Sequence, residues 1–177
     1  MSHEAPHAHR AYAPEKLRCA ILTVSDSRDA KSDGSGDAIA SALDAAGHAI
    51  ALREIVRDDR AAIGEIVLTC IARPDVDAVL VTGGTGVSPR DQTIEAIEPL
   101  LERQLPGFGE IFRGLSFAEI GPAAMLSRAL AGTAGRTAVF VMPGSRGAVK
   151  LALERLIVPE LPHLVGQLRR KDAPPGR

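Results

Sequence analysis

Short apolar runs that alternate with helix-like segments constrain the fold of this chain more than any other feature of its sequence. Residues 17–24, 76–82 and 137–142 are runs of mostly aliphatic side chains, as expected of strands that are buried on both faces. Residues 48–56 are predicted to form a further strand. Because strands that alternate with helices imply βαβ crossovers, we expect an α/β fold with a mainly parallel sheet covered on both faces.

The segments between these strands repeat their apolar residues at the spacing of a helix. Ile63, Ile66 and Val67, for example, share one helical face, and Gly47 ends an earlier repeat. Residues 122–128 are expected to add a short helical turn. The helices are predicted over residues 39–46, 63–71, 94–101, 108–120 and 149–157.

The length and composition fit one domain with short tails. We expect a flexible tail over residues 1–16, a domain over 17–168 and a second tail over 169–177. Hydrophobic residues make up 45% of the chain but aromatic residues only 3%, so the core must be built from Ala, Val, Ile and Leu. Cys19 and Cys70 each lie in an apolar segment, which favours two buried thiols in a reducing compartment over a disulfide or a zinc site.

Several classes of protein are disfavoured by charge and hydropathy. A net charge of -1 is unsuited to electrostatic binding of nucleic acid. No apolar run approaches the ~20 residues that span a bilayer, and the first residues lack the apolar stretch of a signal peptide. We therefore predict a cytoplasmic protein with neither nucleic acid nor membrane as a partner. His3, His7 and His9 are interpreted as solvated side chains, because no carboxylate or cysteine accompanies them as a metal ligand.

Residues 82–91, with the sequence TGGTGVSPRD, form the most informative segment. Glycines at a strand end let the backbone turn tightly and direct its N–H groups at phosphate oxygens. Thr82, Thr85 and Ser88 are candidate hydroxyl donors. The dinucleotide fingerprint is absent, because Pro89 stands where the third glycine is required, and there is no P-loop. A nicotinamide-dependent dehydrogenase is therefore disfavoured.

Two further loops are expected at the same edge of the sheet, because ligands of such folds bind outside the carboxyl ends of the strands. One is the polar loop that Ser25 opens after the first strand. The other is Pro143-Gly144-Ser145, which follows the last strand and precedes a helix. Its backbone donors and hydroxyl fit an anion site, but a plain turn in which Ser145 caps the helix fits equally well.

Two aspartates are predicted to face these loops. Asp58 follows the second strand and Asp91 follows the Gly-rich segment. Either carboxylate fits a helix N-cap. Two carboxylates beside phosphate loops also fit a Mg²⁺-nucleotide site, because Mg²⁺ binds a few carboxylates together with phosphate oxygens. Asp59 is a rival to Asp58 for this role, and local sequence does not separate them.

Taken together, these segments resemble the MoaB/MogA family of molybdenum cofactor biosynthesis, which includes the G domains of plant and animal molybdenum-insertion proteins. The similarity covers roughly residues 17–168. It is carried, in order, by the stretches ILTVSDSR, VRDD, LVTGGTGVSPRDQT, PGFGEIFRGLSF, MLSRALAG and MPGS.

The resemblance implies a fold and an activity. Members of the family form a three-layer α/β/α domain and assemble as trimers or hexamers. Active members use Mg²⁺-ATP to adenylylate molybdopterin, giving an AMP-bearing pterin and pyrophosphate. Their two functional aspartates correspond to Asp58 and Asp91, which would also hold Mg²⁺. With the loop residues above, the predicted binding residues are Ser25, Thr82, Gly83, Gly84, Thr85, Gly86, Ser127, Pro143, Gly144 and Ser145.

Three departures favour the MoaB branch, some members of which are thought to be inactive. The loop reads MPGS rather than PGN, Ile94 replaces the proline of TPEA, and Arg57 replaces a common proline. The alternative to an adenylyltransferase is therefore an inactive carrier of pterin or nucleotide, or a partner protein in cofactor assembly. A weaker hypothesis is an oligomerisation module, in which Phe108, Phe112 and Phe117 pack between subunits instead of in the core.

Overall fold

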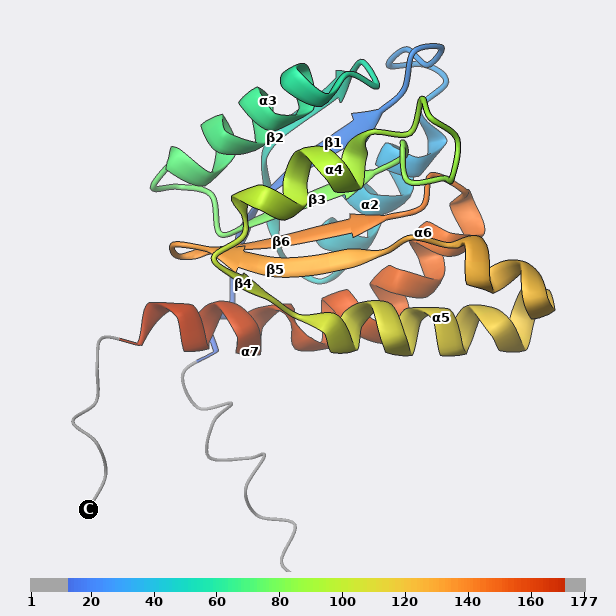
Figure 1. The fold of residues 1–177 in the computed structure, drawn as a ribbon. Coiled ribbons are helices and arrows are strands. Elements are labelled where there is room, and N and C mark those ends of the chain that lie inside the picture. Colours follow the sequence, from blue (N-terminus) through green and yellow to red (C-terminus); the bar gives the residue numbers. More distant parts are fainter. Residues whose placement is uncertain (1–12, 171–177) are drawn as a thin grey trace, which may run out of the picture.

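The computed structural model describes residues 13–170, which form a six-stranded sheet with helices on both faces (Figure 1). Across the sheet the strand order is β2-β1-β3-β6-β5-β4. All strands expected from the sequence are present, which confirms the α/β fold and its mostly parallel sheet. The strands are β1 (Arg18–Val24), β2 (Ala49–Val56), β3 (Ala78–Thr82), β4 (Arg103–Gln104), β5 (Leu130–Ala134) and β6 (Thr137–Met142).

The register of the parallel strands brings their carboxyl ends to one edge. β1 pairs with both β2 and β3, and β3 pairs with β6, all in parallel. Thr23 lies beside Thr82, and Thr82 lies beside Met142. The loops that leave β1, β3 and β6 therefore begin next to one another, as expected from the sequence (Figure 1).

The antiparallel half of the sheet was not predicted from the sequence. β5 pairs with β6 through a tight turn at Gly135, where φ is +56°, and β4 pairs with β5. The β5 segment LAGTA is made mostly of small residues with low strand propensity, so it carries little signal. Its Gly132 lies against β4, because a Cβ there would approach the carbonyl oxygen of Arg103 within 2.5 Å.

The helices follow the predicted order but differ in extent. The expected helix over residues 94–101 is short and continues as a 3-10 turn, because Pro99 lacks the N–H group of an α-helical bond. The expected last helix runs on through a π-turn to Arg169. The helices are α2 (Gly34–Ala45), α3 (Arg60–Ala72), α4 (Thr93–Ile97), α5 (Pro106–Ile120), α6 (Arg146–Ala152) and α7 (Val158–Arg169), with 3-10 turns η1 (Glu98–Leu100) and η2 (Gly121–Leu126) and the π-turn η3 (Leu153–Ile157).

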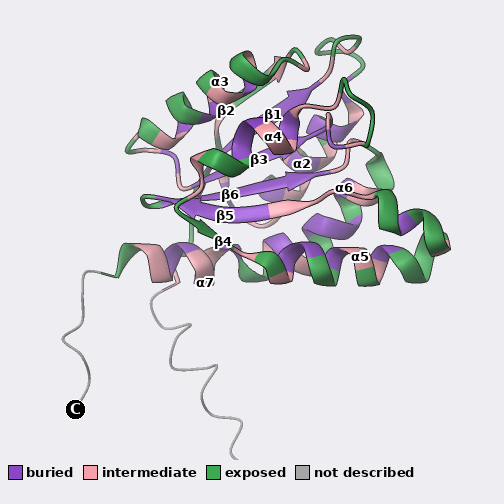
Figure 2. Ribbon diagram, in the orientation of Figure 1, coloured by how far each residue is buried: buried purple, intermediate pink, exposed green. Residues whose placement is uncertain are grey.

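Two apolar layers hold the helices to the sheet. On one face, α3 and α4 pack on the strands through side chains such as Ile63 and Val67. On the other, α2, α5, α6 and α7 pack on the same strands around Leu80 and Phe112 (Figure 1). β1, β3 and β6 are buried almost throughout, as expected of strands covered on both faces (Figure 2).

The predicted phenylalanine cluster divides between core and surface. Phe108 and Phe112 belong to the core, and the ring of Phe108 meets that of Phe140 edge to face at 5.4 Å. Phe117 instead is 60% exposed. The hypothesis that all three residues pack between subunits is therefore wrong for Phe108 and Phe112.

The cysteines are where the sequence placed them, in the core. Cys19 and Cys70 are free and buried. Burial, helped by the negative charge of Asp77, raises the pKa of Cys19 to about 12, so this thiol stays protonated at neutral pH.

The predicted tails lie largely outside the described residues, and His3, His7 and His9 lie wholly outside them. Between residues 13 and 170, none of the helices has the length and hydropathy needed to cross a bilayer.

Candidate phosphate-binding site

Three loops meet at the carboxyl edge of the parallel strands around one cavity of about 530 Å³. They are the loops after β1, β3 and β6, which lie at the same end of the sheet in Figure 1. The sequence predicted this convergence. The cavity is lined by Val24, Ser25, Ser27, Arg28, Gly83, Gly84, Thr85, Gly86, Asp91, Leu126, Ser127, Pro143, Gly144 and Ser145.

The Gly-rich loop owes its path to two glycines with positive φ. φ is +95° at Gly83 and +60° at Gly84, a region that other residues rarely adopt. A Cβ on Gly84 would also collide with the hydroxyl of Thr93 and approach Asp58 Oδ2 at 2.7 Å. The Thr93 hydroxyl donates to the carbonyl oxygen of Gly83 at 2.9 Å, which fixes the start of the loop.

Thr82 does not line the cavity. Its side chain is fully buried, and its hydroxyl donates to the carbonyl oxygen of Pro143 at 3.1 Å. This bond joins the end of β3 to the loop after β6. The predicted ligand donor is therefore a link between two loops of the site.

Asp58 lies beside Gly84 of the Gly-rich loop but is not among the residues that line the cavity. Its Oδ1 accepts a hydrogen bond from the backbone N–H of Gln92 at 3.0 Å, and its own N–H donates to Asp26 Oδ1 at 3.1 Å. Burial raises the pKa of Asp58, an effect opposed by the Gln92 bond and reinforced by the charges of Asp91, Asp26 and Glu95. A cation that approaches Asp58 would therefore stabilise the ionised form of its carboxyl group.

The structure separates Asp58 from its rival. Asp59 is the N-cap of α3, because its side chain accepts a hydrogen bond from the N–H of Ala62 at 2.9 Å. The N-cap role considered for Asp58 therefore belongs to Asp59, and it is Asp58 that lies next to the Gly-rich loop.

Asp91 lines the cavity directly and is not a helix cap. Its Oδ2 accepts a hydrogen bond from the N–H of Ser88 at 3.0 Å, which closes a turn within the loop. α4 begins two residues later, with Gln92 as an N-cap that makes no side-chain bond. The N-cap role considered for Asp91 is therefore wrong.

The carboxylates of the site form no complete metal cage. Between residues 13 and 170, no group of three or more His, Cys, Asp or Glu side chains is placed to hold a metal ion. A magnesium ion that is shared with phosphate oxygens needs only one or two carboxylates, since it keeps several water ligands. Asp91, with Asp58 nearby, meets that smaller requirement.

The predicted serines line the cavity, and two of them also shape its loops. Ser25 Oγ accepts a hydrogen bond from the N–H of Arg28 at 3.2 Å. Ser145 caps α6, because its Oγ accepts a hydrogen bond from the N–H of Ala148 at 3.2 Å. Its side chain therefore has the role that the plain-turn interpretation predicts. Ser127 follows η2 and faces the cavity from the opposite half of the sheet.

Arg128 was missed by sequence reasoning, although it follows Ser127 in the LSR motif. Its guanidinium donates to the carbonyl oxygens of Thr85 at 3.0 Å and Asp91 at 3.2 Å, and it forms an ion pair with Glu95. It therefore holds the Gly-rich loop at two points, near its middle and at its end. The LSR motif contains this arginine, but its partners lie 33 to 43 residues away in the sequence, so local pattern does not reveal what it binds.

Asp33 was also missed, and its side chain joins β1 and β2 to the start of α2. It is fully buried, caps α2 through the N–H of Gly36, and accepts from Thr23 and Arg53. Burial alone would raise the pKa of Asp33, but the hydrogen bonds from Gly36, Arg53 and Thr23 outweigh it, so that the pKa lies below its ordinary value.

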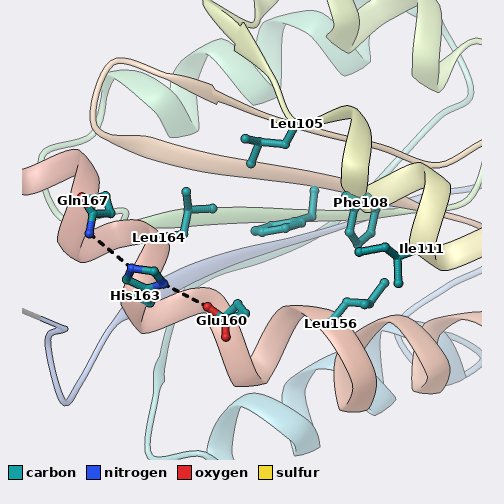
Figure 3. Close-up of a pocket in the computed structure, with 9 residues that line it drawn as sticks. Leu105, Phe108, Ile111, Leu156, Glu160, His163, Leu164 and Gln167 are labelled. Carbon is teal, nitrogen blue, oxygen red and sulfur yellow. Dashed lines mark hydrogen bonds and ion pairs between the residues drawn. The ribbon is translucent and has the colours of Figure 1, made fainter. Parts of the chain in front are cut away.

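A second hollow of about 310 Å³ lies between α5 and the segment formed by η3 and α7 (Figure 3). Its walls are mostly apolar, as at Leu105, Phe108 and Leu156. Its polar groups already bond to one another, because the ring of His163 lies 3.0 Å from Glu160 and 3.2 Å from Gln167. This hollow offers no backbone cradle for phosphate, so the cavity at the sheet edge is the better candidate.

Comparison with known proteins agrees with this fold. A family model described as a probable molybdopterin binding domain matches residues 20–163. Molybdenum cofactor biosynthesis protein B of Bacillus subtilis (strain 168) is 53% identical over 163 residues, which are 92% of this chain and 96% of that protein.

Solved structures of similar proteins superpose over most of the chain. A crystal structure of a molybdenum cofactor biosynthesis protein B has a TM-score of 0.87 at 50% identity, covering 90% of this chain and 99% of that one. The tungsten cofactor synthesizing protein MoaB of Pyrococcus furiosus has a TM-score of 0.75 at 36% identity, covering 89% and 100%.

Proposed function

The chain belongs to the MoaB/MogA family of molybdenum cofactor biosynthesis proteins, and from that premise we propose that it binds molybdopterin and adenylylates it with Mg²⁺-ATP. The products would be an AMP-bearing pterin and pyrophosphate. Molybdopterin and ATP are thus the ligands proposed for the cavity at the sheet edge.

The observation that carries this proposal is the convergence of three loops and one carboxylate on a single cavity of about 530 Å³. Backbone N–H groups of Gly-rich turns bind phosphate oxygens well. The hydroxyls of Ser25, Thr85 and Ser127 add further donors within the same lining. A pterin phosphate and a nucleotide both need such donors.

The proposed reaction asks for positioning more than for a covalent nucleophile. A terminal phosphate oxygen of molybdopterin attacks the α-phosphorus of ATP. A new P–O bond forms, the bond from the α-phosphorus to the bridging oxygen breaks, and pyrophosphate leaves with that oxygen. Such transfers depend on alignment and on neutralising charge. The loops would align the two phosphates, and Ser127 would hold the pterin from the side of β5.

Asp58 and Asp91 are proposed to hold the magnesium ion. When bound, Mg²⁺ neutralises phosphate charge and orients the leaving group. The two carboxylates would bind it together with phosphate oxygens and water. The raised pKa of Asp58 fits this role, since a nearby cation relieves the cost of its ionised form.

An inactive carrier is the second candidate, and the loop after β6 favours it. Its sequence is MPGS, and the Ser145 side chain is used to cap α6. A carrier would keep the phosphate cradle and bind pterin or nucleotide without turnover, or hand it to a partner protein in cofactor assembly.

Pyrophosphate release separates the two candidates. Purified protein would be mixed with molybdopterin and Mg²⁺-ATP, and pyrophosphate would be measured with a coupled assay. An adenylyltransferase should release one pyrophosphate per pterin and lose turnover in Asp58→Asn and Asp91→Asn. Tight binding of pterin or nucleotide without pyrophosphate would identify a carrier, and binding of neither ligand would reject both candidates.

We also propose that the protein is a cytoplasmic homo-oligomer, a trimer or a hexamer, as in its family. The support lies on α5 and η2, where five large apolar side chains are more than half exposed. They are Ile111, Phe117, Ile120, Met125 and Leu126. Sedimentation of the protein and of a Phe117→Asp variant tests this surface, because loss of an interface residue should lower the mass. An unchanged mass in the variant would place the interface elsewhere.

A further inference from the structure

Arg28 is the one basic side chain among the described residues that line the phosphate-binding cavity. It lies in the loop after β1, which also supplies Ser25 and Ser27. The remaining lining is made of glycines, hydroxyls, apolar groups and the carboxylate of Asp91. A cavity that takes anionic ligands thus has a single positive side chain with which to attract them.

In the part of the chain that the structure describes, the guanidinium of Arg28 has only neutral partners. It donates to the hydroxyl of Ser35 and to the carbonyl oxygen of Gly144 at 3.3 Å. Within residues 13–170 it forms no ion pair, in contrast to Arg53, which pairs with Asp33, and Arg128, which pairs with Glu95. The half-buried charge of Arg28 is therefore left without a counter-ion.

An oxyanion would satisfy this charge better than its present partners do. Guanidinium and phosphate form parallel, charge-assisted hydrogen bonds that are stronger than bonds to neutral acceptors. The contact with the Gly144 oxygen is long, so little is lost when a ligand replaces it.

The position of Arg28 also indicates which phosphate it would bind. Asp91 packs at Gly86 and Asp58 at Gly84, on the side of the cavity formed by the loop after β3. Arg28 reaches Gly144, in the loop after β6. The phosphates of Mg²⁺-ATP bring their own cation, whereas a phosphate monoester needs a positive charge from the protein.

We propose that Arg28 recognises the terminal phosphate monoester of the pterin, releasing the Gly144 carbonyl to do so. The proposal rests on the function proposed above and names the residue that distinguishes a phosphorylated pterin from an unphosphorylated one. Arg28 is thus a specificity-determining residue, and its contribution depends on the ligand phosphate.

The test is a cycle that pairs an Arg28 variant with removal of the ligand phosphate. Molybdopterin and its dephosphorylated form, made with alkaline phosphatase, would be titrated against wild type, Arg28→Gln, Arg28→Lys and Arg155→Gln by pterin fluorescence. Arg155, in η3, is outside the cavity lining and is the matched control. Thermal unfolding of each variant would verify that it folds.

Losing charge-assisted bonds should weaken binding of molybdopterin by Arg28→Gln about 10- to 100-fold. Binding of the dephosphorylated form should change less than about 2-fold, because the lost bonds go to its missing phosphate. Arg28→Lys should fall between wild type and Arg28→Gln, and Arg155→Gln should match wild type.

The outcomes keep the two proposals apart. If wild type binds molybdopterin and Arg28→Gln binds it equally well, or loses both ligand forms alike, Arg28 is not the phosphate receptor and the proposed function stands. If wild type fails to bind molybdopterin, the proposed function is wrong. In that case inorganic pyrophosphate becomes the probe: binding lost in Arg28→Gln would retain Arg28 as an anion receptor, and unchanged or absent binding would reject it.

Discussion

The Oδ1 atom of Asp58 accepts a hydrogen bond from the backbone N–H of Gln92 at 3.0 Å. This bond joins the segment between β2 and α3 to the end of the Gly-rich loop, 34 residues further along the chain. Asp58 also lies near three other carboxylates, those of Asp91, Asp26 and Glu95. The same side chain therefore holds the loop in place and concentrates negative charge beside it.

Asp58→Asn should separate stability from function. The folded state raises the pKa of Asp58, so the ionised carboxyl is less favourable there than in the unfolded chain, and this cost is absent at low pH. The asparagine oxygen keeps the Gln92 bond without the charge. We expect a melting temperature equal to or above that of wild type at pH 7, a smaller difference near pH 4, and loss of pyrophosphate release. Thermal unfolding at both pH values measures the first two, and a melting temperature well below wild type at pH 7 would contradict them.

Arg128 should act on the Gly-rich loop together with Glu95. Arg128→Gln removes the bonds to the Thr85 and Asp91 carbonyl oxygens, so amide exchange between residues 85 and 93 should become faster. In a double-mutant cycle with Glu95→Gln, we expect a coupling energy of about 0.5–1.5 kcal/mol, because the two side chains form one ion pair. Chemical unfolding gives the coupling energy, and strictly additive effects would show that the pair does not anchor the loop.

Asp33 should make the protein sensitive to acid. Its pKa is below the ordinary value of 3.8, so its stabilising effect is complete above that value and is lost as the pH falls through the lower folded-state pKa. Asp33→Asn should cost about 1.5–3 kcal/mol at pH 7, because it removes the charge that strengthens the hydrogen bonds from Thr23 and Arg53. Urea unfolding across pH should show this difference shrinking below pH 3.8. A gap that stays constant would mean that packing, and not charge, explains the loss.

Gly84 and Gly114 should respond in opposite ways to alanine. At Gly84 φ is +60° and a Cβ would collide with Thr93, so Gly84→Ala should destabilise the protein by at least about 1 kcal/mol and weaken phosphate binding. Gly114 lies inside α5, and a Cβ there meets nothing within 4 Å, so Gly114→Ala should stabilise by about 0.4–1 kcal/mol. Urea unfolding of both variants measures the contrast. Equal effects at the two sites would refute the strain assigned to the loop.

How far the sequence predicts the structure depends on the kind of signal. The strands β1, β3 and β6 are continuous apolar runs, and the sequence located each of them to within about two residues. β5 escaped because its residues are mostly small, and β4 because it has only two residues. β5 becomes a strand by pairing with β6, and β4 by pairing with β5. No local sequence pattern records such pairing.

By itself, the sequence determined the fold class and the three loops, and it left Asp58 and Asp59 as alternatives, because strand burial and glycine content are written locally along the chain. Only the tertiary structure decided that Asp59 caps α3 while Asp58 bonds to Gln92, that Thr82 holds Pro143, and that Arg28 bonds to Gly144 at the cavity. These are contacts between groups far apart in sequence. Their existence depends on the packed sheet, which brings loop ends together at distances that local spacing does not encode.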